Sequence, residues 1–240
     1  MLKEMFPEAR VARLDQDTGS KKGATINILK QVQNRTIDII VGTQMLAKGH
    51  DFPAITLVGI ICADMSLNFP DFRSGERTFQ LLAQVAGRAG RGDLPGKVIM
   101  QTYTPDHFSI EASKNQDFME FYAREFPFRQ ALSYPPVSRI IQLKISGINK
   151  DKVEQHALMV GELCQALIPK NLPPSHAVQI LGPIEAGIPK IALRYRWQLL
   201  MKSPSATTLN ELITRMISDK KAFASKEVKV SIDVDPYFML

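Results

Sequence analysis

The sequence is poor in cysteine and contains neither a long apolar run nor a secretory leader. Only two cysteines occur in 240 residues, Cys62 and Cys164, and no Cys-x-x-Cys pair is present, so we expect no zinc site within this chain. No stretch approaches the roughly 20 consecutive apolar residues that cross a bilayer, and residues 1–7 lack the apolar core and cleavage site of a secretory signal. We therefore expect a cytoplasmic protein without membrane contact, in which both cysteines are small buried hydrophobic side chains.

Two nucleotide-binding segments are also absent. The chain has no Gly-x-x-x-x-Gly-Lys-[Ser/Thr] loop, whose backbone N–H groups would cradle phosphates, and no Asp-Glu-x-His segment, which would hold magnesium and position water. These are the Walker A and Walker B segments of P-loop enzymes. Their absence excludes a self-sufficient P-loop nucleotidase.

The charge that is present is unevenly distributed. The chain carries a net charge of +6, and its residues are 45% hydrophobic and 22% charged, which is typical of a folded protein. Residues 1–130 hold 16 Lys/Arg against 15 Asp/Glu, whereas residues 131–240 hold 14 against 9. The basic excess therefore lies in the C-terminal part, where a polyanion would be attracted. Taken alone, an excess of this size is more often a matter of solubility than of nucleic-acid binding.

The first half of the chain alternates strand and helix patterns. β-branched or alternating runs predict strands at residues 10–14, 36–41, 56–62 and 96–102, and the run at 36–41 is typical of a strand buried on both faces. Helical spacing of apolar residues predicts helices at residues 21–33 and 74–85. This alternation indicates an α/β fold with a partial parallel sheet. One or two helices over residues 108–132 end before Pro135-Pro136, and this pair predicts a boundary between domains 1–134 and 135–240.

The second half has a different pattern. Strands are predicted at residues 139–146, 178–181, 197–201 and 228–234, with helices at 152–167 and 209–217. The resulting order, β-α-β-β-α-β, is that of an α+β ferredoxin-like domain.

The run QVAGRAGRG at residues 84–92 is the first that indicates chemistry. In a continuous helix, one face would carry Gln84, Gly87, Arg88 and Arg91. An arginine fork stays charged and clamps phosphate oxygens in a bidentate manner, while glycine lets a phosphate approach the backbone. The pattern therefore predicts arginine fingers for a phosphoryl group in transfer. A solvated Gly-Arg surface turn is the simpler interpretation, and the full Gln-x-x-Gly-Arg-x-x-Arg spacing disfavours it.

A second run that indicates chemistry is GTQMLAKGHDFP at residues 42–53. It begins where the strand at 36–41 ends, and α/β sheets place their ligand sites at that edge. Thr43 and Gln44 offer hydroxyl, amide and backbone donors to a nucleic-acid phosphate, and Gly49 permits a tight turn.

Three further side chains of this run are candidate ligands. Asp51 can orient a ribose hydroxyl or pair with an arginine. Lys48 and His50 can contact phosphates, and for both a solvated loop position is an equally good interpretation.

Taken together, these runs resemble a known family. Residues 42–53 look like the fifth motif of superfamily 2 helicases, and residues 84–91 look like the sixth. Residues 63–77 (ADMSLNFPDFRSGER), Leu181-Gly182-Pro183, residues 194–198 (RYRWQ) and Asp233-Val234-Asp235-Pro236 are similar to the signature of the primosomal replication-restart helicases, the PriA family. The resemblance covers essentially the whole chain.

The resemblance implies an ATP-driven three-prime-to-five-prime DNA helicase that recognises stalled or abandoned replication forks and supports primosome assembly. It implies that residues 1–134 form the second RecA-like lobe. Arg88 and Arg91 would be its arginine fingers, and Gln84 and Gly87 would belong to the same interlobe surface.

The resemblance also assigns roles to the second run. Thr43 and Gln44 would contact the DNA backbone, as would Lys48, and Gly49 and Asp51 would frame a nucleotide-facing turn.

In the C-terminal domain, the resemblance implies binding of branched and single-stranded DNA, of the single-stranded-DNA-binding protein and of other primosome proteins. Arg194 and Arg196 are candidate DNA contacts, since cations interleaved with aromatic residues suit backbone contact and base stacking. We expect Trp197, which lies between Arg196 and Gln198, to be a core residue. A monomer is expected.

The family has parts that this sequence lacks, namely the nucleotide-holding lobe and a cysteine-rich zinc module. We therefore expect the chain to be a C-terminal fragment that uses ATP and Mg²⁺ only with the first lobe and is inactive alone. Two alternatives remain: a non-enzymatic module that binds DNA or protein, and lobe 2 of another superfamily 2 repair helicase.

Overall fold

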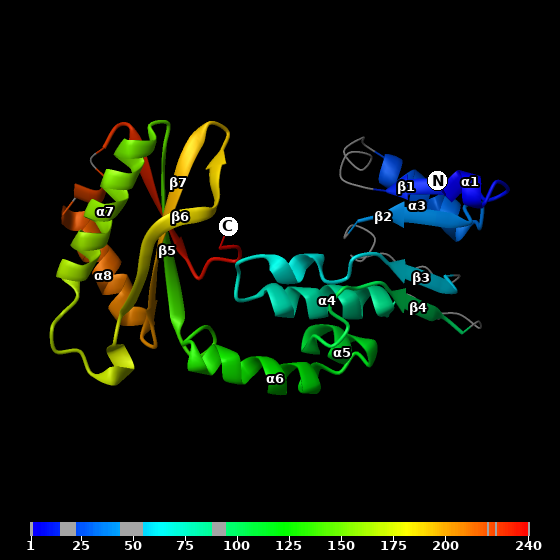
Figure 1. Ribbon diagram of the computed structural model, residues 1–240, viewed down its shortest axis with the longest axis horizontal. Helices are drawn as coiled ribbons and strands as arrows, with labels where there is room; N and C mark the ends of the chain where they lie inside the picture. The colour runs from blue at the N-terminus through cyan, green and yellow to red at the C-terminus, as the bar shows by residue number, and fades with distance from the viewer. Residues whose placement is uncertain are drawn as a thin grey trace. The chain divides into compact units, whose positions relative to one another are not determined.

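Two compact units make up the chain in a computed structural model (Figure 1). The structure describes residues 2–14, 23–43, 55–87, 95–219, 221–223 and 225–239. The first unit comprises residues 1–69 and 73–124, and the second comprises residues 70–72 and 125–240. From the sequence, we predicted a domain boundary after Tyr134. The position of that boundary stays a prediction.

The first unit contains two pairs of parallel strands. Strand β1 (Val11–Leu14) pairs with β2 (Ile39–Gly42), and β3 (Leu57–Ile60) pairs with β4 (Lys97–Met100). The parallel pairing agrees with the alternation in the sequence, but the described strands form two separate two-stranded sheets and not one sheet. The expectation that residues 36–41 are buried on both faces is wrong, because none of them is buried and Val41 is 40% exposed.

Helices of the first unit pack against these strands. The first unit contains α1 (Leu2–Met5), α3 (Ala24–Gln33), the short 3-10 helix η2 (Met65–Asn68), α4 (Ser74–Ala86) and α5 (Phe108–Lys114). Amphipathic α4 buries Phe79 and Leu82 at helical spacing. The ring of Phe79 stacks on that of Phe121 with centroids 4.6 Å apart.

Helix α6 (Phe118–Ala131) joins the units, since the division at residues 124 and 125 falls inside it. The helical pattern over residues 108–132 is thus two helices, which was one of the two possibilities read from the sequence.

The second unit is a four-stranded antiparallel sheet in the order β6-β7-β5-β8. Its elements are β5 (Arg139–Gly147), α7 (Lys150–Leu167), the 3-10 helix η3 (Pro174–His176), β6 (Gln179–Ile191), β7 (Arg194–Ser203), α8 (Ala206–Asp219), the 3-10 helix η4 (Lys221–Phe223) and β8 (Val228–Val234). The predicted order of strands and helices is confirmed.

Strand β6 is longer than the sequence predicted. Pro183 and Pro189 made the region after Leu181 look broken, but proline is tolerated in an edge strand and at bulges. β6 is an edge strand, and its pairing with β7 shifts register after Leu181 and again after Glu185.

Helices α7 and α8 cover one face of this sheet (Figure 1). Leu143, Leu199 and Met201 form a fully buried core with Val160 and Met216 from the two helices. Trp197 packs against this core, so its expected structural role is confirmed.

The two cysteines differ. Cys164 is buried, and burial raises the pKa of its thiol to about 11, so it behaves as a small hydrophobic residue as expected. Cys62 is only half-buried, because it follows β3 in a left-handed backbone conformation outside the core.

Among the described residues of the second unit, no helix packs on the opposite face of the sheet, which we call the helix-free face. Ile140, Leu200 and Met239 form a small cluster there, against which Phe72 and Tyr134 pack. Within the described ranges, no helix is long and apolar enough to cross a membrane.

Candidate functional site

The first half of the predicted arginine-finger motif lies at the end of α4. Gln84 is exposed on this helix, whereas Leu82 and Ala86 are buried on its inner face. The helix ends at Ala86, and the N–H of Gly87 donates to the carbonyl of Ala83 at 3.0 Å. Arg88 and Arg91 lie outside the described residues, so their orientation stays a prediction.

Nothing in the local backbone requires glycine at position 87. Its φ of −68° and ψ of 2° are open to any residue. A Cβ atom built there would meet the Ala83 carbonyl oxygen at 3.4 Å and the Gln116 side-chain oxygen at 3.7 Å, which are ordinary contacts.

Thr43 is exposed and directly follows β2, at the C-terminal edge of the β1–β2 pair as predicted. The other candidates of this run lie outside the described residues: Gln44, Lys48, Gly49, His50 and Asp51.

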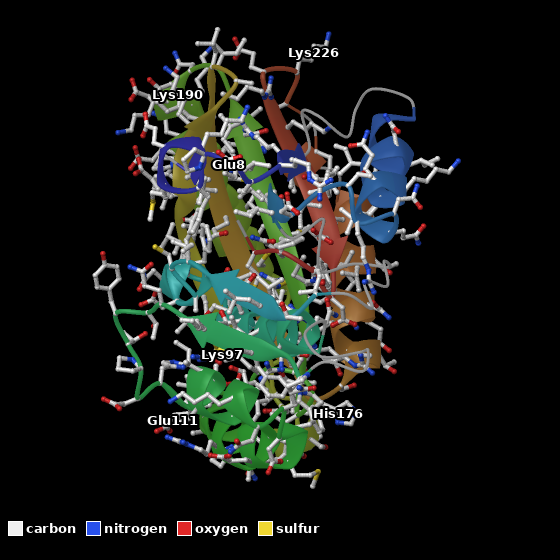
Figure 2. All side chains as sticks on the ribbon, turned by 90° about the vertical axis from the view of Figure 1, so that its right-hand side faces the viewer. Glu8, Lys97, Glu111, His176, Lys190 and Lys226 are labelled. Carbon is white, nitrogen blue, oxygen red and sulfur yellow. The ribbon has the colours of Figure 1, made fainter. Side chains whose placement is uncertain are left out.

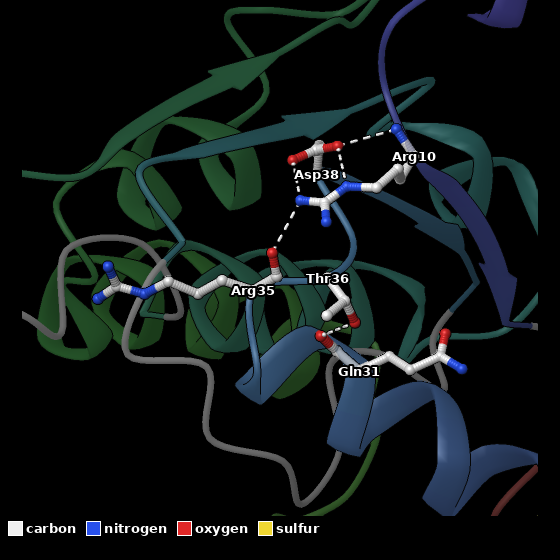
Figure 3. Close-up of polar contacts among 5 residues, drawn as sticks. All are labelled: Arg10, Gln31, Arg35, Thr36 and Asp38. Atoms are coloured by element: carbon white, nitrogen blue, oxygen red, sulfur yellow. Dashed lines mark hydrogen bonds and ion pairs between the residues drawn. The ribbon is translucent and has the colours of Figure 1, made fainter.

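The N-terminal edge of the same strand pair is held by an ion pair (Figure 3). The Arg10 guanidinium donates to both carboxylate oxygens of Asp38 at 2.8 Å and to the Arg35 carbonyl at 2.8 Å. The backbone N–H of Arg10 also donates to Asp38. These hydrogen bonds hold the pKa of Asp38 well below its ordinary value. The ion pair therefore fixes the N-terminal ends of β1 and β2. The candidate residue Thr43 follows the C-terminal end of β2.

Asp64, which follows β3, also connects two chain segments through hydrogen bonds. Its buried carboxylate accepts from the backbone N–H of Tyr103 at 2.8 Å and from the hydroxyl of Thr104 at 3.3 Å. Burial alone would raise the pKa of Asp64, but hydrogen bonds from these two residues, Thr102 and its own backbone lower it overall. Asp64 thus ties the segment after β3 to the segment after β4. Sequence reasoning placed Asp64 in a family signature without this role.

The lowered pKa values predict acid sensitivity of the first unit. A carboxyl group whose folded pKa is depressed contributes stability above its unfolded pKa of about 3.9, and this is lost as the pH falls through the folded value. We therefore expect the protection factors of the Leu57–Ile60 amides, which compare observed with intrinsic exchange rates, to fall as the pH drops below about 4. The double variant Asp38→Asn/Asp64→Asn should lose most of this acid response. An identical pH dependence in parent and variant would contradict the prediction.

Arg194 and Arg196 lie on the helix-free face of the C-terminal sheet, because residues of β7 alternate between faces and Trp197 faces the helices. Both arginines are half-buried. Arg194 donates to the Ser146 carbonyl at 2.9 Å, and Arg196 lies 3.5 Å from the Ile188 carbonyl.

Two lysines that the sequence did not single out join this face. Lys144 lies on β5 two residues before Ser146, the partner of Arg196, and Lys229 on β8 pairs with Ser146 from the other side. The Lys144 ammonium group pairs with Asp233 at 2.8 Å. The signal was present as alternation within β5 and β8, but only the strand register brings the four cations together.

A pocket of about 220 Å³ opens at the β8 end of this group of cations. Its lining includes the cations Arg194, Lys226 and Lys229 and the hydroxyl group of Ser225, together with one carboxylate, Glu227. Figure 2 places Lys190 and Lys226 at the same end of the second unit, away from His176. The arrangement can bind an anion of the size of a phosphate. Among the described residues, no cluster of three or more His, Cys, Asp or Glu side chains could hold a metal ion.

Two family models match the chain. The helicase conserved C-terminal domain matches residues 1–93, and the primosomal protein N C-terminal domain matches residues 130–237. The two matches lie largely in different structural units.

Similar proteins cover the chain almost completely. The replication restart protein PriA of Synechocystis is 47% identical over 98% of this chain, that of Bacillus subtilis is 42% identical over the whole of this chain, and that of Haemophilus influenzae is 37% identical over 98% of this chain. The matched segment makes up 27%, 29% and 31% of these relatives, so the chain spans under a third of their length. A solved structure, the de novo designed protein Foldit4, matches 40% of this chain and 96% of its own, with 16% identity and a TM-score of 0.28, which is too low to assign a fold.

Proposed function

Because the chain belongs to the PriA family of replication restart proteins, we propose that it acts as the C-terminal part of an ATP-driven three-prime-to-five-prime DNA helicase. In this proposal, residues 1–134 are the second RecA-like lobe of the motor. Residues 135–240 are a ferredoxin-like domain, and the strand order β8-β5-β7-β6 supports that description. The assembled protein acts in the cytoplasm, as a monomer, on stalled or abandoned replication forks, where it supports primosome assembly.

The positions of Gln84 and Gly87 at the end of α4 are the observation that supports a role in a helicase motor. The helix α4 exposes Gln84 and ends at a glycine that its own backbone does not require. A glycine that the local backbone does not require suits the close approach of a group from outside the unit, and a nucleotide held by a facing lobe is such a group. Arg88 and Arg91 follow at once, and we assign them the stabilisation of charge that develops on the transferring phosphoryl group.

The facing lobe has to hold ATP with Mg²⁺, which supplies charge neutralisation at the phosphates when bound. Within this chain, we assign Gly49 and Asp51 to the nucleotide-facing turn. Thr43, Gln44 and Lys48 contact the DNA backbone, and the exposed position of Thr43 at the C-terminal edge of β2 supports this.

The helix-free face of the C-terminal sheet is the proposed DNA-binding surface. Lys144, Arg194, Arg196 and Lys229 share it, and the Asp233 carboxylate pairs with Lys144 there. Arginine and lysine contacts to phosphates give affinity without sequence preference, which suits branched and single-stranded DNA. We also assign binding of the single-stranded-DNA-binding protein and other primosome proteins to the assembled protein.

A non-enzymatic binding module is the second candidate function, and the same charged face favours it. The two candidates differ in one respect: a binder has no need of Gln84, Gly87, Arg88 and Arg91 at motif spacing. Lobe 2 of another superfamily 2 repair helicase is disfavoured by the match of residues 130–237 to the primosomal C-terminal model.

The assignment is tested by ATP hydrolysis in three preparations. These are the 240-residue chain, the Bacillus subtilis relative shortened by its matching segment, and a chimaera in which this chain replaces that segment. We expect DNA-stimulated hydrolysis from the chimaera alone. Robust turnover by the 240-residue chain, or a chimaera no more active than the shortened relative, would overturn the proposal.

Gly87→Ala separates function from stability at this site. Since φ is −68° and the new Cβ meets ordinary contacts, we expect the chain to be unchanged or more stable by up to about 1 kcal/mol. In the chimaera, the methyl group should hinder the approach of the facing lobe and lower ATP turnover at least tenfold. The measurements are urea unfolding of the chain and steady-state hydrolysis by the chimaera. A variant of the chimaera with parental turnover would contradict the interlobe placement of Gly87.

A further inference from the structure

A three-residue segment of the first half of the chain is built into the C-terminal unit. The chain enters this unit at Pro70 and leaves it after Phe72, two residues before α4 begins at Ser74. Asp71 is 5% exposed, and its carboxylate accepts from the backbone N–H of Met239, in the C-terminal tail, at 3.3 Å. The segment is therefore held by residues that lie far from it in the sequence.

Phe72 is the centre of a four-membered stack, which we call the clip. Its ring stacks on that of Tyr134, with centroids 4.7 Å apart and an angle of 11° between the planes. The Arg129 guanidinium lies 5.3 Å from the centre of the Phe72 ring, and the Lys202 ammonium group lies 4.3 Å from that of Tyr134. Each of the two stacked rings thus has a cation over it, an arrangement that the ring quadrupole favours.

Both cations of the clip are themselves fixed. Arg129 is only 12% exposed, pairs with Glu125 at 2.9 Å and donates to the Pro135 carbonyl at 3.3 Å. Lys202 is 4% exposed and donates to the Leu132 carbonyl at 2.7 Å, and burial lowers the pKa of its ammonium group. Side chains held in this way order the rings between them, so the clip is a rigid part of the C-terminal unit.

The clip is connected along the chain to both proposed sites. Lys202 is on β7, the strand that also carries Arg194 about 26 Å away and Arg196 about 20 Å away, at 3.3 Å per residue. On the other side of the clip segment in the sequence, helix α4 begins at Ser74 and ends next to Gly87. It has 13 residues and is about 20 Å long at 1.5 Å per residue. A single residue, Arg73, thus separates Phe72 of the clip from the start of α4.

We propose that Asp71 and Phe72 are positioning residues, which hold the first turn of α4 in place and through this helix support the arginine-finger motif that follows it. This inference rests on the proposed role of Arg88 and Arg91. It adds a route by which DNA on the C-terminal sheet controls the hydrolysis of ATP.

The clip is tested by Phe72→Leu, which keeps an apolar side chain but removes the ring. In the chimaera we expect DNA-stimulated kcat to fall at least tenfold, with basal turnover, the KM for ATP and the Kd for DNA within twofold of the parent. Phe72→Tyr, which keeps the ring, should restore the stimulation. The matched control is Phe69→Leu, because Phe69 is 49% exposed and belongs to the other unit.

A second measurement on the 240-residue chain does not depend on ATP. Phe72→Leu should accelerate hydrogen exchange across the first turns of α4 about tenfold, whereas Phe69→Leu should not. Unchanged exchange in α4, or full DNA stimulation of the Phe72→Leu chimaera, would overturn the clip. If Arg88→Ala and Arg91→Ala also leave hydrolysis unchanged, the proposed function fails, and the exchange result alone decides whether α4 is anchored.

Discussion

Replacing Arg88 or Arg91 by alanine should lower DNA-stimulated ATP hydrolysis by the chimaera about a thousandfold, with little loss of DNA affinity. Arginine fingers contribute factors of about 10³–10⁵ to nucleotide hydrolysis, because they neutralise charge that exists only in the transition state. Steady-state hydrolysis at saturating ATP and oligonucleotide measures the effect. Arg88→Lys and Arg91→Lys should recover part of the rate, since lysine keeps the charge but not the bidentate fork.

The control for this experiment is Arg215→Ala, an exposed arginine on α8 of the C-terminal unit. It should hydrolyse ATP like the parent. A parallel loss of DNA affinity and hydrolysis in Arg88→Ala and Arg91→Ala would assign these side chains to DNA binding. The non-enzymatic interpretation would then gain support.

The second large effect concerns salt. Four cations on the helix-free sheet face, each neutralising one phosphate of a single strand, give a slope of log affinity against log salt near −0.7 per contact, or about −2.8 in total. Affinity of the 240-residue chain for an oligothymidine should then fall about fiftyfold between about 50 and 200 mM salt. The double variant Arg196→Gln/Lys229→Gln should halve the slope. Fluorescence anisotropy of a labelled oligonucleotide measures both quantities.

Arg215→Gln is the matched control here too, because α8 packs on the opposite face of the same sheet. It should keep the parental slope. If the double variant and this control have equal slopes, DNA does not bind at the helix-free face. Absence of any affinity at low salt would remove the DNA-binding assignment of residues 131–240.

The C-terminal unit was the more predictable part of the fold. Alternation in residues 139–146 and 228–234 identified β5 and β8 closely, because one face of each strand is buried under α7 and α8. β6 was underestimated since Gly182, Pro183 and Pro189 look like breaks, and only edge position and register shifts reconcile them with a strand.

The first unit was harder to predict for a physical reason. The apolar run at 36–41 indicates a strand, but burial depends on layers that local pattern does not specify, and Val41 is exposed.

In the candidate site, too, local features could be read from the sequence and long-range contacts could not. Motif spacing made Gln84 and Gly87 candidates, and the end of the predicted strand made Thr43 one, because such motifs are local; their roles stay predictions. Long-range pairs left no local signal: Phe72 meets Tyr134 about sixty positions later. The gathering of Lys144 and Lys229 beside Arg196 depends on strand register, which no spacing within one strand encodes.

A crystal structure of the chimaera with ADP and a metal-fluoride mimic of the transferring phosphoryl group tests the central claim most directly. We predict that at least one guanidinium group, that of Arg88 or Arg91, lies within about 3 Å of the fluoride atoms across the cleft. Both side chains paired with carboxylates of their own unit, or directed away from the nucleotide, would contradict the account.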